Sequence, residues 1–253
     1  TSTNTFTTVQ YTYYQETKQE IVSSLESVEV VNDTQSTGHY SLDSAVGMSN
    51  ANDTLSVSDA ITVDEVIRIS HDLTIEGSGT ITSGGNVFEP QSGVSLTLND
   101  LTLNGDGSGM AVDMASGAEV IANRLTIDNY VTGFYVNPNA KLNVSHSTFS
   151  NVTAAIGTDT KAENLTITNN TFEATVVEAL GFTAINDTEE NYEALKVFVI
   201  ANNTGAEGKV NAYGDFLVAF NSTTDAGYTT VQASIDDASE NDTIVVEPGT
   251  YEE

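Results

Sequence analysis

Carboxylates are the side chains of this sequence best suited to chemistry. The chain has 36 Asp and Glu residues among 253, against 7 Lys and Arg. Glycosidases use two carboxyl groups about 5–10 Å apart, and Asp100 and Asp128 would meet this if their segments were neighbouring strands about 4.8 Å apart. With so many acidic residues such proximity is expected without function, so we assign no catalytic pair.

One acidic segment resembles a metal-binding loop. Asn104-Gly-Asp106-Gly-Ser108-Gly109 matches the first half of a calcium loop, but Ala115 stands where a bidentate Glu is needed. A turn is therefore the stronger interpretation, with Asn104 and Asp106 as weak metal candidates. We expect no cofactor, although acidic surfaces could bridge Ca²⁺ or other divalent cations. The chain has no cysteine, and its three histidines lack metal-ligand spacing.

The charge excludes several classes of partner. The formal net charge is −29 at pH 7. Too few cations are present to hold nucleic acid through its phosphates, and no apolar run approaches the roughly 18 residues of a membrane span. Self-repulsion of this size is screened by salt, which suits a saline habitat or a surface layer rich in divalent cations.

Asn-x-Ser/Thr sequences are frequent enough to suggest N-linked glycans on an exported protein. They are found at Asn32, Asn52, Asn143, Asn151, Asn164, Asn169, Asn186, Asn202, Asn221 and Asn241. We favour Asn32, Asn52, Asn186 and Asn221, which are predicted to lie in turns. Others, such as Asn151, could instead be inward-facing structural residues.

A short phrase of alternating polarity recurs along the chain and indicates the architecture. The repeated phrases are 72–77, 100–105, 124–129, 146–151 and 164–169, with the central Thr recurring at steps of 28, 24, 22 and 18 residues. A period near 22 with β alternation predicts a β-solenoid, with the apolar residues inside and Thr outside. The predicted structural asparagine ladder consists of Asn104, Asn129, Asn151 and Asn170. Residues 198–202 are interpreted as a degenerate copy.

A second repeat has a much longer period. Residues 38–57 align without gaps with residues 227–246, at an offset of 189. Each copy is predicted to be a short amphipathic helix, an Asn-Asp-Thr turn and a strand, and Thr229 and Gln232 form a candidate capping box. Such a helix could plug the open end of a solenoid.

The second copy also resembles a known family. Its segment 228–252 is similar to the opening of right-handed parallel β-helix proteins of the pectin-lyase-like superfamily, especially repeat-rich archaeal cell-surface members and the start of pectin methylesterases. The resemblance implies an all-β fold, a right-handed parallel β-helix with a short capping helix. The family's catalytic residues find no matching motif here. Arg124 is the one basic residue that follows a repeated phrase, and we interpret it as an ion-pair partner between turns.

These observations predict three regions. Residues 1–37 are an N-terminal extension, either a cap or a donated strand, residues 38–226 are a parallel β-helix of seven to nine turns, and residues 227–253 duplicate its opening. The duplicate lies where a following module or a neighbouring subunit would dock. Its candidate interface residues are Tyr228, Val231, Ile235, Ile244, Val246 and Tyr251.

The predicted function is structural. We expect a non-enzymatic extracellular protein that self-assembles head to tail, as a homo-polymer, into a surface layer, sheath or filament. The alternative is an adhesin or carbohydrate-binding β-helix, for which Tyr130, Phe134 and Tyr135 are the candidate exposed aromatics. A polysaccharide lyase or hydrolase is a weaker alternative.

Overall fold

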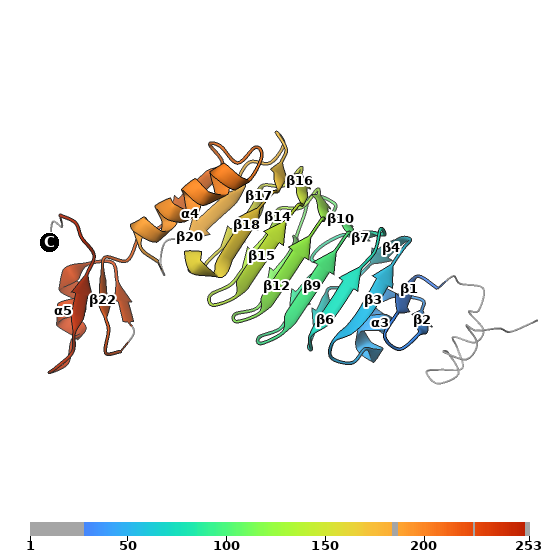
Figure 1. The fold of residues 1–253 in the computed structure, drawn as a ribbon, viewed down its shortest axis with the longest axis horizontal. Coiled ribbons are helices and arrows are strands. Elements are labelled where there is room, and N and C mark those ends of the chain that lie inside the picture. Colours follow the sequence, from blue (N-terminus) through green and yellow to red (C-terminus); the bar gives the residue numbers. More distant parts are fainter. Residues whose placement is uncertain (1–27, 184–186, 225, 251–253) are drawn as a thin grey trace, which may run out of the picture.

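The protein is a parallel β-solenoid in a computed structural model that describes residues 28–183, 187–224 and 226–250 (Figure 1). About six turns are stacked, fewer than the seven to nine expected from the sequence. Each turn contributes one strand to each of three sheets. The expectations for residues 1–27, Asn186 and Tyr251 fall outside the described residues.

The three sheets run the length of the solenoid and are parallel between turns. The first sheet contains β3 (Asp53–Val57), β6 (Leu73–Glu76), β9 (Ser95–Asn99), β12 (Glu119–Asn123), β15 (Lys141–Ser145) and β18 (Leu165–Thr168). The second contains β4 (Ala60–Val63), β7 (Thr80–Ser83), β10 (Thr102–Asn104), β13 (Thr126–Asp128), β16 (Thr148–Ser150) and β19 (Thr171–Phe172). The third contains β5 (Ile67–Ile69), β8 (Phe88–Pro90), β11 (Met110–Met114), β14 (Thr132–Val136), β17 (Ala154–Thr158), β20 (Leu180–Thr183) and β21 (Val210–Tyr213).

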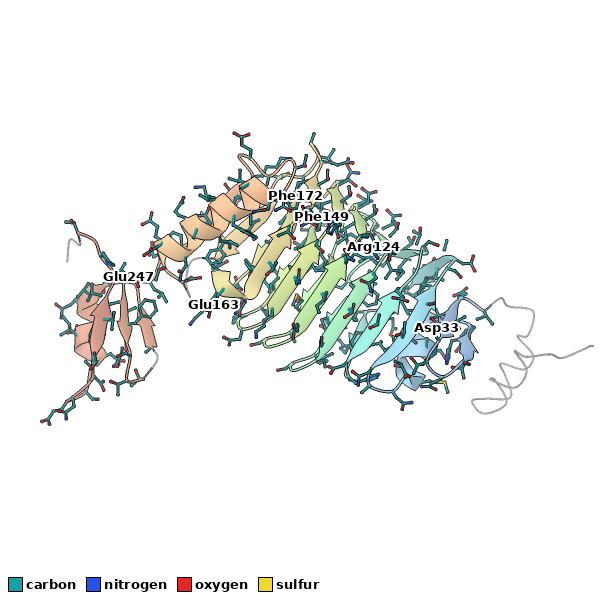
Figure 2. All side chains as sticks on the ribbon, viewed as in Figure 1. Asp33, Arg124, Phe149, Glu163, Phe172 and Glu247 are labelled. Carbon is teal, nitrogen blue, oxygen red and sulfur yellow. The ribbon has the colours of Figure 1, made fainter. Side chains whose placement is uncertain are left out.

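The alternation of the sequence builds the core. In β6 and β9 every second residue is buried, and the intervening Thr side chains face outward as predicted. Like residues stack from turn to turn: the rings of Phe149 and Phe172 (Figure 2) are stacked with centroids 5.2 Å apart. The ring of Phe134 meets that of Phe149 edge-on, with centroids 6.1 Å apart. The apolar interior is therefore one continuous column.

The repeated phrases do not all occupy one sheet, which corrects the predicted spacing. Those at 72–77 and 164–169 form β6 and β18 of the first sheet, whereas the other three form β10, β13 and β16 of the second. The uneven steps of 28 and 18 residues arise where the phrase changes sheet. Within the second sheet, Thr80, Thr102, Thr126, Thr148 and Thr171 are aligned between successive turns.

The predicted asparagine ladder is not a single ladder. Asn129 and Asn151 occupy equivalent left-handed positions, with φ of 61° and 50°. Asn104 instead aligns with Asp128 inside the second sheet, one residue earlier. Asn170 lies at a different corner of the solenoid, between β18 of the first sheet and β19 of the second. Its buried side chain accepts from the Ser147 N–H and donates to the Val144 carbonyl.

A second left-handed position, which the sequence did not reveal, runs along the corner between the first and second sheets. It is occupied by Asp100, Arg124, His146 and Asn169, with φ between 54° and 59°. Apart from glycine, Asn, Asp and His are the residues enriched in this conformation, so Arg124 broke the pattern and the shared position gave no clear sequence signal. The predicted ion pair of Arg124 is present: its Nη2 lies 2.6 Å from Asp100 Oδ2 on the preceding turn.

Residues 198–202 form part of a helix, not a strand, which corrects the interpretation of this segment as a degenerate solenoid phrase. α4 (Glu189–Asn202) begins at the N-cap Thr188, whose side chain accepts from the Asn191 N–H. Its buried residues Tyr192, Leu195 and Val199 pack on the last turn, beside the short η1 (Ala162–Asn164). Helical spacing of these apolar residues outweighs the strand propensity of the β-branched and aromatic residues at 197–200. Among the described residues, no helix is long and apolar enough to cross a membrane.

Two small modules flank the solenoid. The opening module contains β1 (Val30–Asn32), β2 (Thr37–His39), α3 (Leu42–Met48) and β3. The C-terminal module contains β22 (Ala219–Asn221), β23 (Ala226–Tyr228), α5 (Val231–Asp237) and β24 (Ile244–Val246), and forms its own three-stranded sheet beyond α4 (Figure 1). The C-terminal module therefore begins before residue 227.

Candidate functional site

The two modules are copies of one structure, strand for strand. In the opening module β1 pairs antiparallel with both β2 and β3, and in the C-terminal module β22 pairs in the same way with β23 and β24. The registers match at the offset of 189: Val30 faces Val57, and Ala219 faces Val246. The predicted helix, turn and strand are thus confirmed in both copies, and each module gains a first strand that the alignment had not included.

The helices of the two modules begin with equivalent caps. Ser41 Oγ accepts from the Ser44 N–H at 3.1 Å, and Thr230 Oγ1 accepts from the Ala233 N–H at 3.1 Å. Thr230, not the expected Thr229, is therefore the N-cap residue. A hydroxyl at this position satisfies one of the amide groups that the first helical turn leaves without a partner.

An Asn–Asp pair, buried in the opening module and partly buried in the C-terminal module, ties the first strand of each module to the start of its last strand. Asn32 Nδ2 donates to Asp53 Oδ2 at 2.8 Å, and Asn221 Nδ2 donates to Asp242 Oδ2 at 2.8 Å. Each carboxylate also accepts a backbone N–H, from Asn50 and Ser239 respectively. The pKa of Asp53 is lowered mainly by Asn32, and that of Asp242 by the Ser239 amide and then by Asn221.

These pairs change the interpretation of two predicted glycan acceptors. Asn32 and Asn221 are buried, and the amide nitrogen that a glycan would modify is engaged with a carboxylate. Their shared offset of 189 was the signal for a structural role, because it extends the long repeat back to residue 32. The other sequence-predicted acceptors within the described residues are at least partly exposed: Asn52, Asn143, Asn151, Asn164, Asn169, Asn202 and Asn241.

The modules differ in what covers them. In the opening module α3 contacts β4 and β5 of the first turn, and β3 pairs in parallel with β6. Leu55 and Val57 are therefore fully buried. Their counterparts in the C-terminal module are Ile244, which is partly exposed, and Val246, which is 40% exposed.

The helix shows the same contrast. Val46 of α3 is 6% exposed, whereas its counterpart Ile235 of α5 is 55% exposed. The remaining predicted interface residues, Tyr228 and Val231, are partly exposed, and the Tyr228 hydroxyl donates to Asp237. An apolar surface shielded by a solenoid turn in the first copy is thus open to solvent in the second.

β24 also has an open edge. Ser222 N–H donates to the Thr243 carbonyl and Glu247 N–H to the Val218 carbonyl, so alternate residues of this strand point their backbone groups at β22. By the antiparallel pattern, the N–H and C=O groups of Ile244 and Val246 point the other way. No strand among the described residues pairs with that side.

The weak metal candidates predicted from the sequence lie at the end of β10 and in the turn that follows it. Asp106 accepts from the Ser108 N–H and hydroxyl, so this segment is a turn, and its pKa is lowered by Ser108. Within residues 28–183, 187–224 and 226–250, no three His, Asp or Glu side chains are grouped closely enough to hold a metal ion. A cleft of about 470 Å³ at the start of α4 is lined by Glu189, Glu190, Glu193 and Glu247, among others.

The aromatics proposed as a glycan-binding face are mostly internal. Tyr130 and Phe134 are buried, and the Tyr130 hydroxyl bonds to Ser83. Tyr135 is partly exposed on the third sheet and donates to Asp159 at 2.7 Å, which raises the pKa of Tyr135 to about 12. A single tyrosine held in this way is a poor stacking platform for a sugar.

The outer face of the third sheet carries a row of charged residues. Asp113 stands beside Glu89, and burial, followed by the charge of Glu89, raises the pKa of Asp113. Glu89 is itself paired with Arg68, at 2.7 Å. The row therefore contains one ion pair between neighbouring turns, Arg68–Glu89, with the carboxyl group of Asp113 beside it.

The best candidate for a binding surface is one face of the C-terminal module. It is formed by Ile235, Ile244 and Val246 together with the edge of β24. It offers an apolar patch beside backbone donors and acceptors, which suits binding of another β structure and not acid–base chemistry. Comparison with models of known protein families, with curated proteins and with solved structures finds no match to this chain.

Proposed function

We propose that the protein is a non-catalytic structural component of the cell exterior, in which β-solenoid units are joined head to tail into a filament, sheath or surface layer. The partners of each unit are further units of the same kind. The observation that carries the proposal is the recurrence of the opening module at the far end of the solenoid, with the same strand registers. One solenoid is thus followed by the start of the next.

Repetition of the same module would place successive solenoid units along one axis. Successive units that each begin with the same module are related by the same displacement, and a heterologous contact that does not close produces a linear array. The resemblance to repeat-rich archaeal cell-surface β-helices, the acidic surface and the exposed Asn-x-Ser/Thr sites support an exterior location. Glycans on Asn52 or Asn143, whose side chains are exposed, would lie on the outside of such an array.

The test is to locate the chain on intact cells. Antibodies raised against the purified chain should label exterior filaments, a sheath or a layer, and external protease should remove the label. Electron tomography of the labelled structure should show periodic density that accepts six-turn solenoids, each roughly 30 Å long at about 4.8 Å per turn, placed end to end.

A matched control replaces the chain by a version ending at Leu217, which keeps the solenoid and α4 but lacks the C-terminal module. This version should be exported and yet absent from the assembled structure. Label confined to the cell interior, or full incorporation of the shortened chain, would contradict the proposal.

A further inference from the structure

We propose that the C-terminal module is a second solenoid cap, and that its open face takes a β-solenoid turn that belongs to the same polypeptide as the module. The turn would lie on the module as residues 58–76 lie on residues 29–57. This inference rests on the proposed end-to-end array and specifies how one unit joins the next.

The chemistry of the open face matches that of the covered one. Leu42 and Val46 lie one helical turn apart on α3. Their counterparts on α5 are Val231, which is one carbon smaller than Leu42, and Ile235, which is one carbon larger than Val46. Leu55 and Val57 of β3 correspond to Ile244 and Val246 of β24. A core surface tolerates exchanges that conserve volume and apolar character. The counterpart of Ala45 is Ser234, whose hydroxyl donates to the Val231 carbonyl.

The backbone groups along the open edge of β24 are also positioned to pair with a parallel strand. In the opening module β3 pairs with β1 on one side and with β6 on the other. β24 keeps the first pairing and presents the N–H and C=O groups of Ile244 and Val246 on the second side. A strand of the type Leu73-Thr74-Ile75 would satisfy these groups and place apolar residues beside them.

The occupation of β6 identifies the source of the turn. A second copy of the chain cannot present its first turn, because its own β3 already pairs with β6. Displacing that module would replace one cap with an equivalent one and gain no buried surface. A turn joined directly to the module meets no such competition and has the advantage of a short tether, for which effective concentrations are in the millimolar range.

The experiment extends the chain with its own solenoid. Because residue 246 corresponds to residue 57, residues 1–246 can be followed directly by residues 58–253 to give a tandem chain. A single cysteine is introduced as Ile235→Cys into both the original and the tandem chain, neither of which contains another thiol. Its rate of reaction with a soluble disulfide reagent then reports how far the face is covered.

The thiol at position 235 should react at least about 100-fold more slowly in the tandem chain than in the original chain, because it must wait for local opening. Val46→Cys in the original chain gives the rate for a covered helix, and Val197→Cys, at a 65% exposed site on α4, gives the rate for an open one. Hydrogen exchange provides a second readout: the amides of Ile244 and Val246 should become protected only in the tandem chain.

Two results would overturn the inference. Reaction at position 235 that stays as fast as at position 197 in the tandem chain would show that the module does not accept a turn. Protection in the original chain that increases with protein concentration would show that a second copy covers the face. Either result is separable from the proposed function, since labelling of cells reports location and assembly independently of what covers α5.

Discussion

At the scale of single residues, the Asn–Asp pair is the feature most specific to the modules. The Asp53 carboxylate accepts from Asn32, from the Asn50 amide and from Gln35, and it is almost fully buried. Each acceptor bond satisfies a donor that would otherwise be left without a partner in a turn. The Asp53 carboxylate therefore ties the first strand to the last through Asn32, and it fixes the connection between the helix and the last strand through the Asn50 amide.

Asp53→Ala should lower the free energy of unfolding by about 1–3 kcal/mol at pH 7, because three donors lose a charged acceptor. The folded-state pKa of Asp53 lies below the usual value of 3.8, so its contribution is present above that value and is lost as pH falls through the lowered pKa. Denaturant unfolding between about pH 2 and 7 should show the difference between wild type and variant shrinking in acid.

Asp242→Ala is the matched control, since it removes the equivalent carboxylate from the module that covers no turn. It should leave the unfolding of the solenoid unchanged. Equal losses in the two variants, or a difference for Asp53→Ala that does not shrink as the pH falls, would contradict the role assigned to the Asn32–Asp53 pair.

At the scale of elements, α4 closes the end of the solenoid that the opening module leaves uncovered. Its inner residues Tyr192, Leu195 and Val199 pack on the last turn. The centroid of the Tyr192 ring lies 5.5 Å from the centroid of the Phe182 ring. The outer residues Val197 and Phe198 are exposed. The helix thus protects the apolar column from water, as α3 does at the other end.

Leu195→Ala should reduce stability by about 2–4 kcal/mol, because a buried side chain is removed from a packed interface. Val197→Ala, on the exposed side of the same helix, should change it by no more than about 0.5 kcal/mol. Thermal or denaturant unfolding measures both. Similar effects for the two substitutions would mean that α4 is not the cap of the last turn.

At the scale of the whole molecule, electrostatic repulsion opposes the folded state. The net charge is −29, and the described residues include few ion pairs to offset it: Arg68–Glu89, Arg124–Asp100 and Lys196–Glu193. All three pairs are at the surface, where ion pairs contribute little. Stability is therefore expected to depend on screening by ions.

Raising NaCl from about 0.1 M to about 1 M shortens the Debye length from about 10 Å to about 3 Å. The melting temperature should accordingly rise by at least about 5 °C. CaCl₂ at matched ionic strength separates screening from binding, because cations that bridge acidic surfaces should raise the melting temperature further. A melting temperature unaffected by salt would show that the acidic residues are spaced too far apart to repel one another.

The sequence by itself determined the solenoid and the duplicated module. Alternation such as Leu-Thr-Ile requires one face inside and one outside, and a repeat of about 22 residues leaves each turn dependent on its neighbours. The ungapped alignment at an offset of 189 residues predicted both short helices. Helix caps and apolar spacing depend on residues that are close together in the sequence, so a sequence pattern is enough to identify them. The ion pair of Arg124 followed from its place at the edge of a repeated phrase.

The tertiary structure alone decided which sheet each phrase joins, since identical local patterns fit either sheet and only stacking distinguishes them. It also decided the state of residues 198–202, where packing on the last turn overcomes strand propensity. Asn32 and Asn221 were interpretable as glycan acceptors until the fold placed a carboxylate from about twenty residues away beside each. Most of all, only the fold shows that two equivalent modules differ in burial, because burial depends on what lies alongside a surface and not on the residues within it.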